Sequence, residues 1–307
     1  MNARQPASLL VPLDGSSPAE GLLELAEVIA NLLDARIHVL FVGAELLPTE
    51  ALLVRMRVPR AWIDRIEVHG ATGDAPVAIA EVARRIGAAA VVLSSHGATG
   101  RLEALAGHVT LALLADPPCP VYVVRSALGV RSQIHRLRQL RRILVPLDGT
   151  PEAGRAVSDA AQLAEKAGSR LLMLHVVSGS PLADRRHAAP VYSDQYHHEL
   201  EAWQDEFARA GFARSARPAG VPVEVALRTG DPHVAIADFA RKEDCDLIVA
   251  AWGGRLSPGR AAVVRALLAA APCPLLFLRA ATNASTHRRS EIDGDAGDER
   301  YRGHARR

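Results

Sequence analysis

The stretch LVPLDGS at Leu10–Ser16 recurs as LVPLDGT at Leu144–Thr150. Two further stretches repeat in the same order: TGDAPVAIA at 72–80 returns as TGDPHVAIA at 229–237, and PPCPVYVVR at 117–125 returns as APCPLLFLR at 271–279. Three matches in one order indicate an internal duplication. The chain therefore contains two copies of one unit, and a length of 307 residues is in the range that favours two domains.

Within each copy, short apolar runs alternate with segments of helical periodicity. Residues 9–13 and 37–42 predict strands, and residues 22–33 recur at helical spacing between them. Ser16-Ser17-Pro18 predicts the start of that helix, because serine can cap a helix and proline fits its first turn. The alternation predicts an α/β fold with two tandem, doubly wound, parallel five-stranded sheets of Rossmann-like type.

Composition suggests where the domains end. We predict a first domain at 1–128, a second domain at 141–280 and a disordered hydrophilic tail at 281–307. The basic segment at 129–140 is interpreted as a solvated linker, with a surface helix as the alternative. The second copy carries an insertion at residues 179–220, whose dense His and Glu residues fit a solvated amphipathic helix better than a metal site.

Charge and cysteine content exclude several classes of protein. A net charge of +2 and no aromatic residues among the arginines argue against nucleic-acid binding. Three widely spaced cysteines form neither a disulfide framework nor a CxxC metal motif, so a reducing cytoplasm is the expected location. No stretch reads as a signal peptide or a membrane span. We therefore expect a cytoplasmic protein without membrane contact.

The stretch VVLSSHGATGRLEALAGHVT at residues 91–110 predicts an anion site. It passes from a buried strand through a small-residue turn to a glycine that opens a helix. Backbone N–H groups of such turns and helix starts carry partial positive charge and can hold phosphates without a lysine. Gly97 and Gly107 are the candidate loop glycines, and His108, Val109 and Thr110 form the predicted first helical turn.

Together these motifs resemble the universal stress protein family over residues 8–126 and 141–280. The resemblance implies a pattern G-x2-G-x9-G-[S/T], with an aspartate after the first strand and a valine at the end of the second contacting adenosine. It also implies dimers of such domains. In the first copy it assigns Asp14, Val42, Gly97 and Gly107 to these positions, and Gly15 and Ser16 complete the motif after the first strand.

Two positions of the first copy depart from that pattern. Ser94 stands where the first motif glycine is expected, and it adds a Cβ and a hydroxyl near the ligand. His108 replaces the serine or threonine and can still donate a hydrogen bond to phosphate. The second copy keeps Asp148 and Val176, and Gly254 takes the place of the second glycine. Its following loop is three residues shorter, so we expect one better and one poorer site.

The sequence favours a regulatory role for a bound ligand. No Ser-His-Asp order, paired carboxylates or metal-ligand spacing emerges, and the GxxxxGK[ST] motif is absent. We expect a tandem universal stress protein that binds ATP, with or without Mg²⁺, or another adenine nucleotide. Two alternatives stay open: a nucleotide-free scaffold and a weak ATPase. The apolar last strand of each copy predicts contact between the copies or with a second chain.

Overall fold

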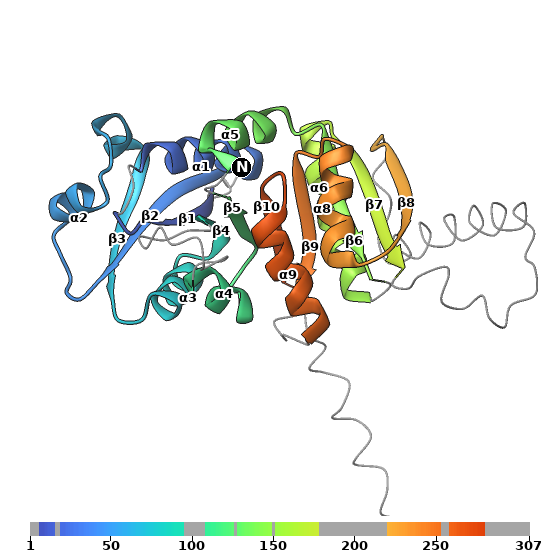
Figure 1. Cartoon of the computed structure of the whole chain (residues 1–307). Coiled ribbons are helices and arrows are strands. Elements are labelled where there is room, and N and C mark those ends of the chain that lie inside the picture. Colours follow the sequence, from blue (N-terminus) through green and yellow to red (C-terminus); the bar gives the residue numbers. More distant parts are fainter. Residues whose placement is uncertain are drawn as a thin grey trace, which may run out of the picture.

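The structure is a computed structural model of the chain that describes residues 6–15, 19–94, 108–125, 128–148, 151–177, 220–252 and 258–279 (Figure 1). Strands and helices alternate along both copies, which confirms the predicted α/β fold. Among the described residues, no helix is long and apolar enough to cross a membrane.

The first copy supplies five strands and their helices. Its elements are β1 (Ala7–Pro12), α1 (Glu20–Leu33), β2 (Ala35–Gly43), α2 (Thr49–Arg55), the 3-10 helix η1 (Arg60–Arg65), β3 (Ile66–Thr72), α3 (Ala75–Arg85), β4 (Ala88–Ser94), α4 (His108–Ala115) and β5 (Val121–Val124).

The second copy repeats this order after a connecting helix. Its elements are α5 (Val130–Gln139), β6 (Arg142–Leu147), α6 (Pro151–Ala167), β7 (Arg170–Val177), β8 (Val223–Thr229), α8 (Pro232–Lys242), β9 (Leu247–Trp252), α9 (Pro258–Ala270) and β10 (Leu275–Arg279).

The two five-stranded sheets join into one sheet of ten strands. The strand order is β3-β2-β1-β4-β5-β10-β9-β6-β7-β8, and pairing is parallel within each half. At the centre, β5 and β10 pair antiparallel, with Tyr122 opposite Leu276. This pairing, called the seam below, confirms the predicted contact between the last strands of the copies. Because β5 and β10 each have a neighbour on both sides, neither offers a free edge for the same contact with a second chain.

The antiparallel seam sets the directions of the two halves. Strands of the first half run with β5, and strands of the second half run with β10. The strands of the two halves therefore run in opposite directions. Their carboxyl ends lie on opposite sides of the sheet, measured along the strand direction.

Each face of the sheet carries one apolar core that continues across both halves. On one face, α1, α5 and α6 contribute to a shared core with residues such as Ile29, Leu137 and Val157. On the other face, α3, α4, α8 and α9 pack over residues such as Leu10 and Ile248 (Figure 1). The duplication therefore produces one folded body, although each copy keeps its own set of crossovers.

Two arginines at equivalent positions of the two copies form contacts across the seam. Arg125 follows β5, and its guanidinium donates hydrogen bonds to the carbonyl oxygens of Ala269 and Ala271 at the end of α9. Arg279 ends β10, and its Nη2 lies 3.3 Å from Asp116 Oδ1 beyond the end of α4. Each half thus places an arginine at the end of a helix in the other half, where positive charge is favourable.

The basic segment between the copies differs from a solvated connector. Residues 130–139 form α5, which buries Gln133, Ile134 and Leu137 against α1 and the sheet. The Gln133 side chain is fully buried: its amide donates to the carbonyl of Arg125 at 2.6 Å and accepts from the Arg125 N–H at 2.9 Å. Arg131 and Arg138 are exposed as predicted, whereas Arg136 is partly buried and donates a hydrogen bond to Asp244 Oδ1 at 2.9 Å.

Aspartate side chains cap two of the helices. Asp74 and Asp231 cap α3 and α8 through side-chain hydrogen bonds from the N–H groups of Val77 and His233, at 3.3 and 2.9 Å. Helix α1 begins at Glu20 with no side-chain cap bond, and the predicted start at 16–18 lies outside the described residues.

Candidate functional site

The candidate site of the first half lies where the strand order reverses. β2 and β3 extend the sheet on one side of β1, whereas β4 and β5 lie on the other side. In an open α/β sheet this reversal leaves a crevice at the carboxyl ends of the two strands that flank it. Asp14 follows β1 and Ser94 ends β4, so two predicted site residues lie on either side of that position.

Strand register brings Asp14 next to Val42. Pro12 is opposite Leu40, and the Leu13 N–H donates to the Leu40 carbonyl at 2.8 Å. Continuing this register by two residues places Asp14 beside Val42. Asp14 is exposed, and Val42 is partly buried against the core on the α3 side of the sheet. A carboxylate that accepts hydrogen bonds therefore lies next to an apolar side chain.

Gly15 makes a tight turn directly after Asp14. Its φ of +73° lies in the left-handed region, which favours glycine. A Cβ at this position would collide with the carbonyl oxygen of Arg55 at the end of α2. The chain after β1 thus passes directly against α2, which borders the site.

The start of α4 lies against the end of β4. The buried Thr110 hydroxyl donates to the carbonyl oxygen of Ser94 at 3.5 Å. His108 is exposed as the first residue of α4, and Val109 is partly buried. The backbone N–H groups that have no acceptor within the helix, and the positive end of the α4 dipole, therefore lie at the carboxyl end of β4, close to Ser94.

Several predicted site residues lie outside the described residues. These are Ser16, Gly97, Gly107 and Gly254. The insertion up to residue 219 and the tail at 280–307 lie outside them as well.

The second half repeats the aspartate–valine arrangement. β6 and β7 pair with Leu147 opposite His175, so Asp148 and Val176 are the next residues along each strand. Asp148 is exposed and Val176 is partly buried, like their counterparts in the first half. His175 Nδ1 lies 2.9 Å from the Leu147 carbonyl oxygen, and because a carbonyl only accepts, Nδ1 carries the proton.

The three cysteines do not form a reactive site. All are free thiols, and burial raises the pKa of Cys119 and of Cys245 to about 12. Burial also raises the pKa of Cys273. Since the thiolate is the nucleophile, these side chains stay protonated and unreactive near neutral pH. Cys273 is a buried packing residue, and Cys119 is partly buried.

Sequence reasoning missed a group of polar side chains in the first half. His38 on β2 and Glu67 and His69 on β3 bring their nitrogen and oxygen atoms within 4.8 Å of one another. Burial lowers the pKa of both histidines; for His69 the nearby His38 and Arg85 act in the same direction, whereas Glu67 opposes the shift in both. Both imidazoles are therefore neutral near pH 7. The available signal was the i, i+2 spacing of Glu67 and His69, which places them on one face of a strand.

Comparison with known proteins identifies relatives of both halves. The sequence model of the family described as "Universal stress protein family" matches residues 44–125 and 139–279. The match covers well over half of the chain and falls on both copies.

Solved structures share the fold of the whole chain. A universal stress protein from Archaeoglobus fulgidus is 20% identical, and the match covers 91% of this chain and 100% of that chain with a TM-score of 0.62. A putative universal stress protein from Pseudomonas aeruginosa is 19% identical, with 90% and 94% covered and a TM-score of 0.61. A universal stress protein from Archaeoglobus fulgidus in complex with dAMP is 21% identical, with 45% and 98% covered and a TM-score of 0.33. At these identities the first two matches concern the fold.

Proposed function

Since the chain belongs to the universal stress protein family, we propose that its first half binds ATP or another adenine nucleotide as a regulatory ligand. The observation that carries the proposal is the convergence of Asp14, Val42 and the start of α4 at the carboxyl ends of strands beside the β1–β4 reversal. This is the position at which open α/β sheets bind their ligands.

Each group of the site suits one part of a nucleotide. The exposed carboxylate of Asp14 accepts hydrogen bonds from ribose hydroxyls or an exocyclic amine. Val42 supplies an apolar surface for a flat base. The amino end of α4 attracts phosphate oxygens, and His108 adds a ring N–H donor there.

The second half is proposed to be the poorer site. Asp148 and Val176 hold the adenosine positions, but its loop after β9 is three residues shorter than the loop after β4. Binding at either site acts by mass action: a ligand that prefers one arrangement of the chain shifts the population toward it by its differential affinity.

Nucleotide occupancy per chain tests the proposal. Purified protein is denatured, and the released small molecules are separated and identified; protein stripped of ligand is then titrated calorimetrically with ATP, with and without Mg²⁺. We expect one tighter and one weaker site. Asp14→Ala should weaken the tighter site about tenfold to a hundredfold, because a hydrogen bond to a charged acceptor contributes about 1.5–3 kcal/mol.

Two further variants show which site a change in ATP binding comes from. Asp148→Ala should change only the weaker site. Asp64→Ala is the matched control, because this exposed aspartate lies on η1 just before β3 and so at the opposite end of the strands. Protein that carries no nucleotide and gives no heat with millimolar ATP would overturn the proposal in favour of the scaffold. ATP turnover that both Asp14→Ala and Asp148→Ala eliminate would instead identify a weak ATPase.

A further inference from the structure

The group formed by His38, Glu67 and His69, called the His–Glu cluster below, lies apart from the proposed nucleotide site. Pairing of β2 with β3 sets His38 opposite Glu67 and Leu40 opposite His69, so the three side chains share the α3 face of the sheet. His38 precedes Val42 by four residues, about 13 Å along a strand, and His69, which pairs with Leu40, lies about 7 Å from the level of Val42. The proposed nucleotide site therefore does not account for these three side chains.

The spacing of the ligand atoms fits a metal ion. His38 Nδ1 lies 3.0 Å from His69 Nε2 and 3.4 Å from Glu67 Oε2. A tetrahedral Zn²⁺ with bonds of about 2.0–2.2 Å keeps its ligand atoms about 3.3–3.5 Å apart. Two of the three separations are thus within a few tenths of an ångström of that value, and the His69 and Glu67 ligand atoms, which lie within 4.8 Å of each other, would adjust on binding.

Burial and access also fit an ion with one open side. The His38 side chain is 8% exposed, whereas that of Glu67 is 52% exposed. The His38 imidazole is thus buried, that of His69 is partly buried, and the Glu67 carboxylate borders solvent. Two histidines with one carboxylate form a three-residue set typical of open zinc sites.

The surrounding charges limit the affinity. Arg36 Nη1 lies 3.8 Å from Glu67 Oε1, so that oxygen faces the guanidinium while Oε2 faces the imidazole. Arg85 adds a second positive charge near His69. Arg36 is 66% exposed, so solvent screens much of its repulsion for a cation.

Comparison with the second copy shows which residues of the cluster are required for pairing of the two strands. At the equivalent positions of β7 and β8, Arg170 and Glu224 form an ion pair of 2.5 Å, so the edge keeps its Arg–Glu pair. The two histidines are replaced there by Leu172 and Ala226, which lie on the apolar face. The strand pairing therefore does not require the imidazoles.

We propose that His38, Glu67 and His69 bind a divalent transition-metal ion, Zn²⁺ in the first instance, and that only the first half of the chain carries this site. The two imidazoles are ligands through His38 Nδ1 and His69 Nε2, and Glu67 is a ligand through Oε2. Water takes the remaining position on the exposed side.

Metal titration of the full chain tests the site. Protein treated with a chelator and dialysed is titrated with Zn²⁺ by calorimetry and with Co²⁺ by visible absorption, whose d–d bands report coordination geometry. The chain has twelve histidines, so the decisive quantity is the difference between variants. We expect His38→Leu with His69→Ala, the residues of the second copy, to remove one metal equivalent and the Co²⁺ bands. Glu67→Gln should weaken binding at least tenfold.

His135→Ala is the matched control, because this histidine is exposed on α5. It should leave both titrations unchanged. The proposal is overturned if the double variant binds Zn²⁺ and Co²⁺ with the stoichiometry and affinity of the unaltered chain, which would leave the two imidazoles as a hydrogen-bonded pair. Since the Glu67 position is half-exposed, Glu67→Gln gives an independent result should the double variant fold poorly.

Discussion

At the scale of single residues, Gly15 has the least conformational freedom among the described residues of the candidate site. Its left-handed φ and the nearby Arg55 carbonyl oxygen are separate reasons why a side chain does not fit there. The conformation alone costs a non-glycine residue about 1–3 kcal/mol. Relief of the collision would also displace the end of α2 or the turn that carries Asp14.

We expect Gly15→Ala to lower the free energy of unfolding and to weaken ATP binding. Gly87→Ala is the control, because Gly87 has a φ of +60° but nothing within 4 Å of its added Cβ. Urea unfolding should show both variants destabilised, with Gly15→Ala affected more, and calorimetry should show a loss of ATP affinity for Gly15→Ala alone. Equal effects of the two variants would show that contact with Arg55 is unimportant.

Single residues also show where sequence reasoning stops. Asp14 and Val42 were predicted from a motif, and strand register places them side by side. The His–Glu cluster was missed because His38 and His69 come from different strands, and their contact depends on the register between β2 and β3. That register is a property of the folded sheet, which a pattern within one segment does not contain.

At the scale of elements, α5 shows how a charged segment can be part of a core. Its basic composition suggested a solvated connector, yet Gln133, Ile134 and Leu137 are buried at helical spacing. The helical spacing of these three residues is present in the sequence. A glutamine is expected to be exposed, however, unless the groups that bond its amide are known. The sequence predicted the strands more accurately than α5, with ends shifted by one or two residues. A short apolar run directly indicates a buried strand.

Gln133 should be a large single contributor to the stability of this element. Replacing it with leucine leaves the backbone N–H and carbonyl of Arg125 without the partners that the side chain provides. Since each unpaired buried polar group costs about 1–3 kcal/mol, we expect Gln133→Leu to destabilise the chain by about 2–4 kcal/mol. Gln139→Leu, at an exposed position on the same helix, should change the urea midpoint little. Similar midpoints for both variants would contradict this account of α5.

At the scale of the whole molecule, the seam makes two copies into one folded body. The sequence predicted the duplication and the pairing of the last strands, because both follow from local motifs. It did not predict that each apolar core would run across the seam, or that Arg125 would reach the end of α9. These contacts join residues from different copies, and they depend on how the two sheets twist together.

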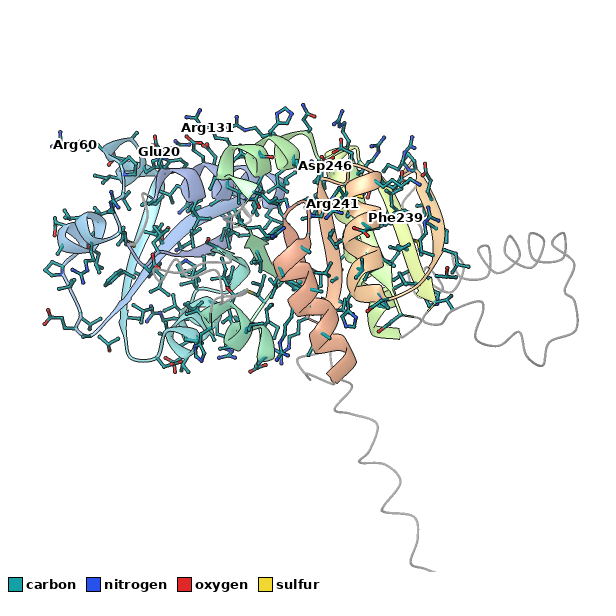
Figure 2. The ribbon with its side chains drawn as sticks, viewed as in Figure 1. Glu20, Arg60, Arg131, Phe239, Arg241 and Asp246 are labelled. Carbon is teal, nitrogen blue, oxygen red and sulfur yellow. The ribbon has the colours of Figure 1, made fainter. Side chains whose placement is uncertain are left out.

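Arg125→Ala should weaken the seam. The substitution removes two charge-assisted hydrogen bonds and a positive charge at the end of α9, so we expect a loss of about 2–4 kcal/mol of stability. Because the cores are continuous, calorimetry should show both halves melting together at a lower temperature. Arg131→Ala is the control, since Arg131 is exposed on the outer side of α5 (Figure 2). A variant as stable as this control would mean that the seam depends on β5 and β10 alone.

The opposed directions of the two sets of strands also separate what the copies can sense. Their candidate sites lie at opposite ends of the strands of one continuous sheet. Substitutions at one candidate site can then accumulate without altering the surface around the other site. Under the proposed function, the two sites would therefore present their ligands on two different surfaces of the molecule.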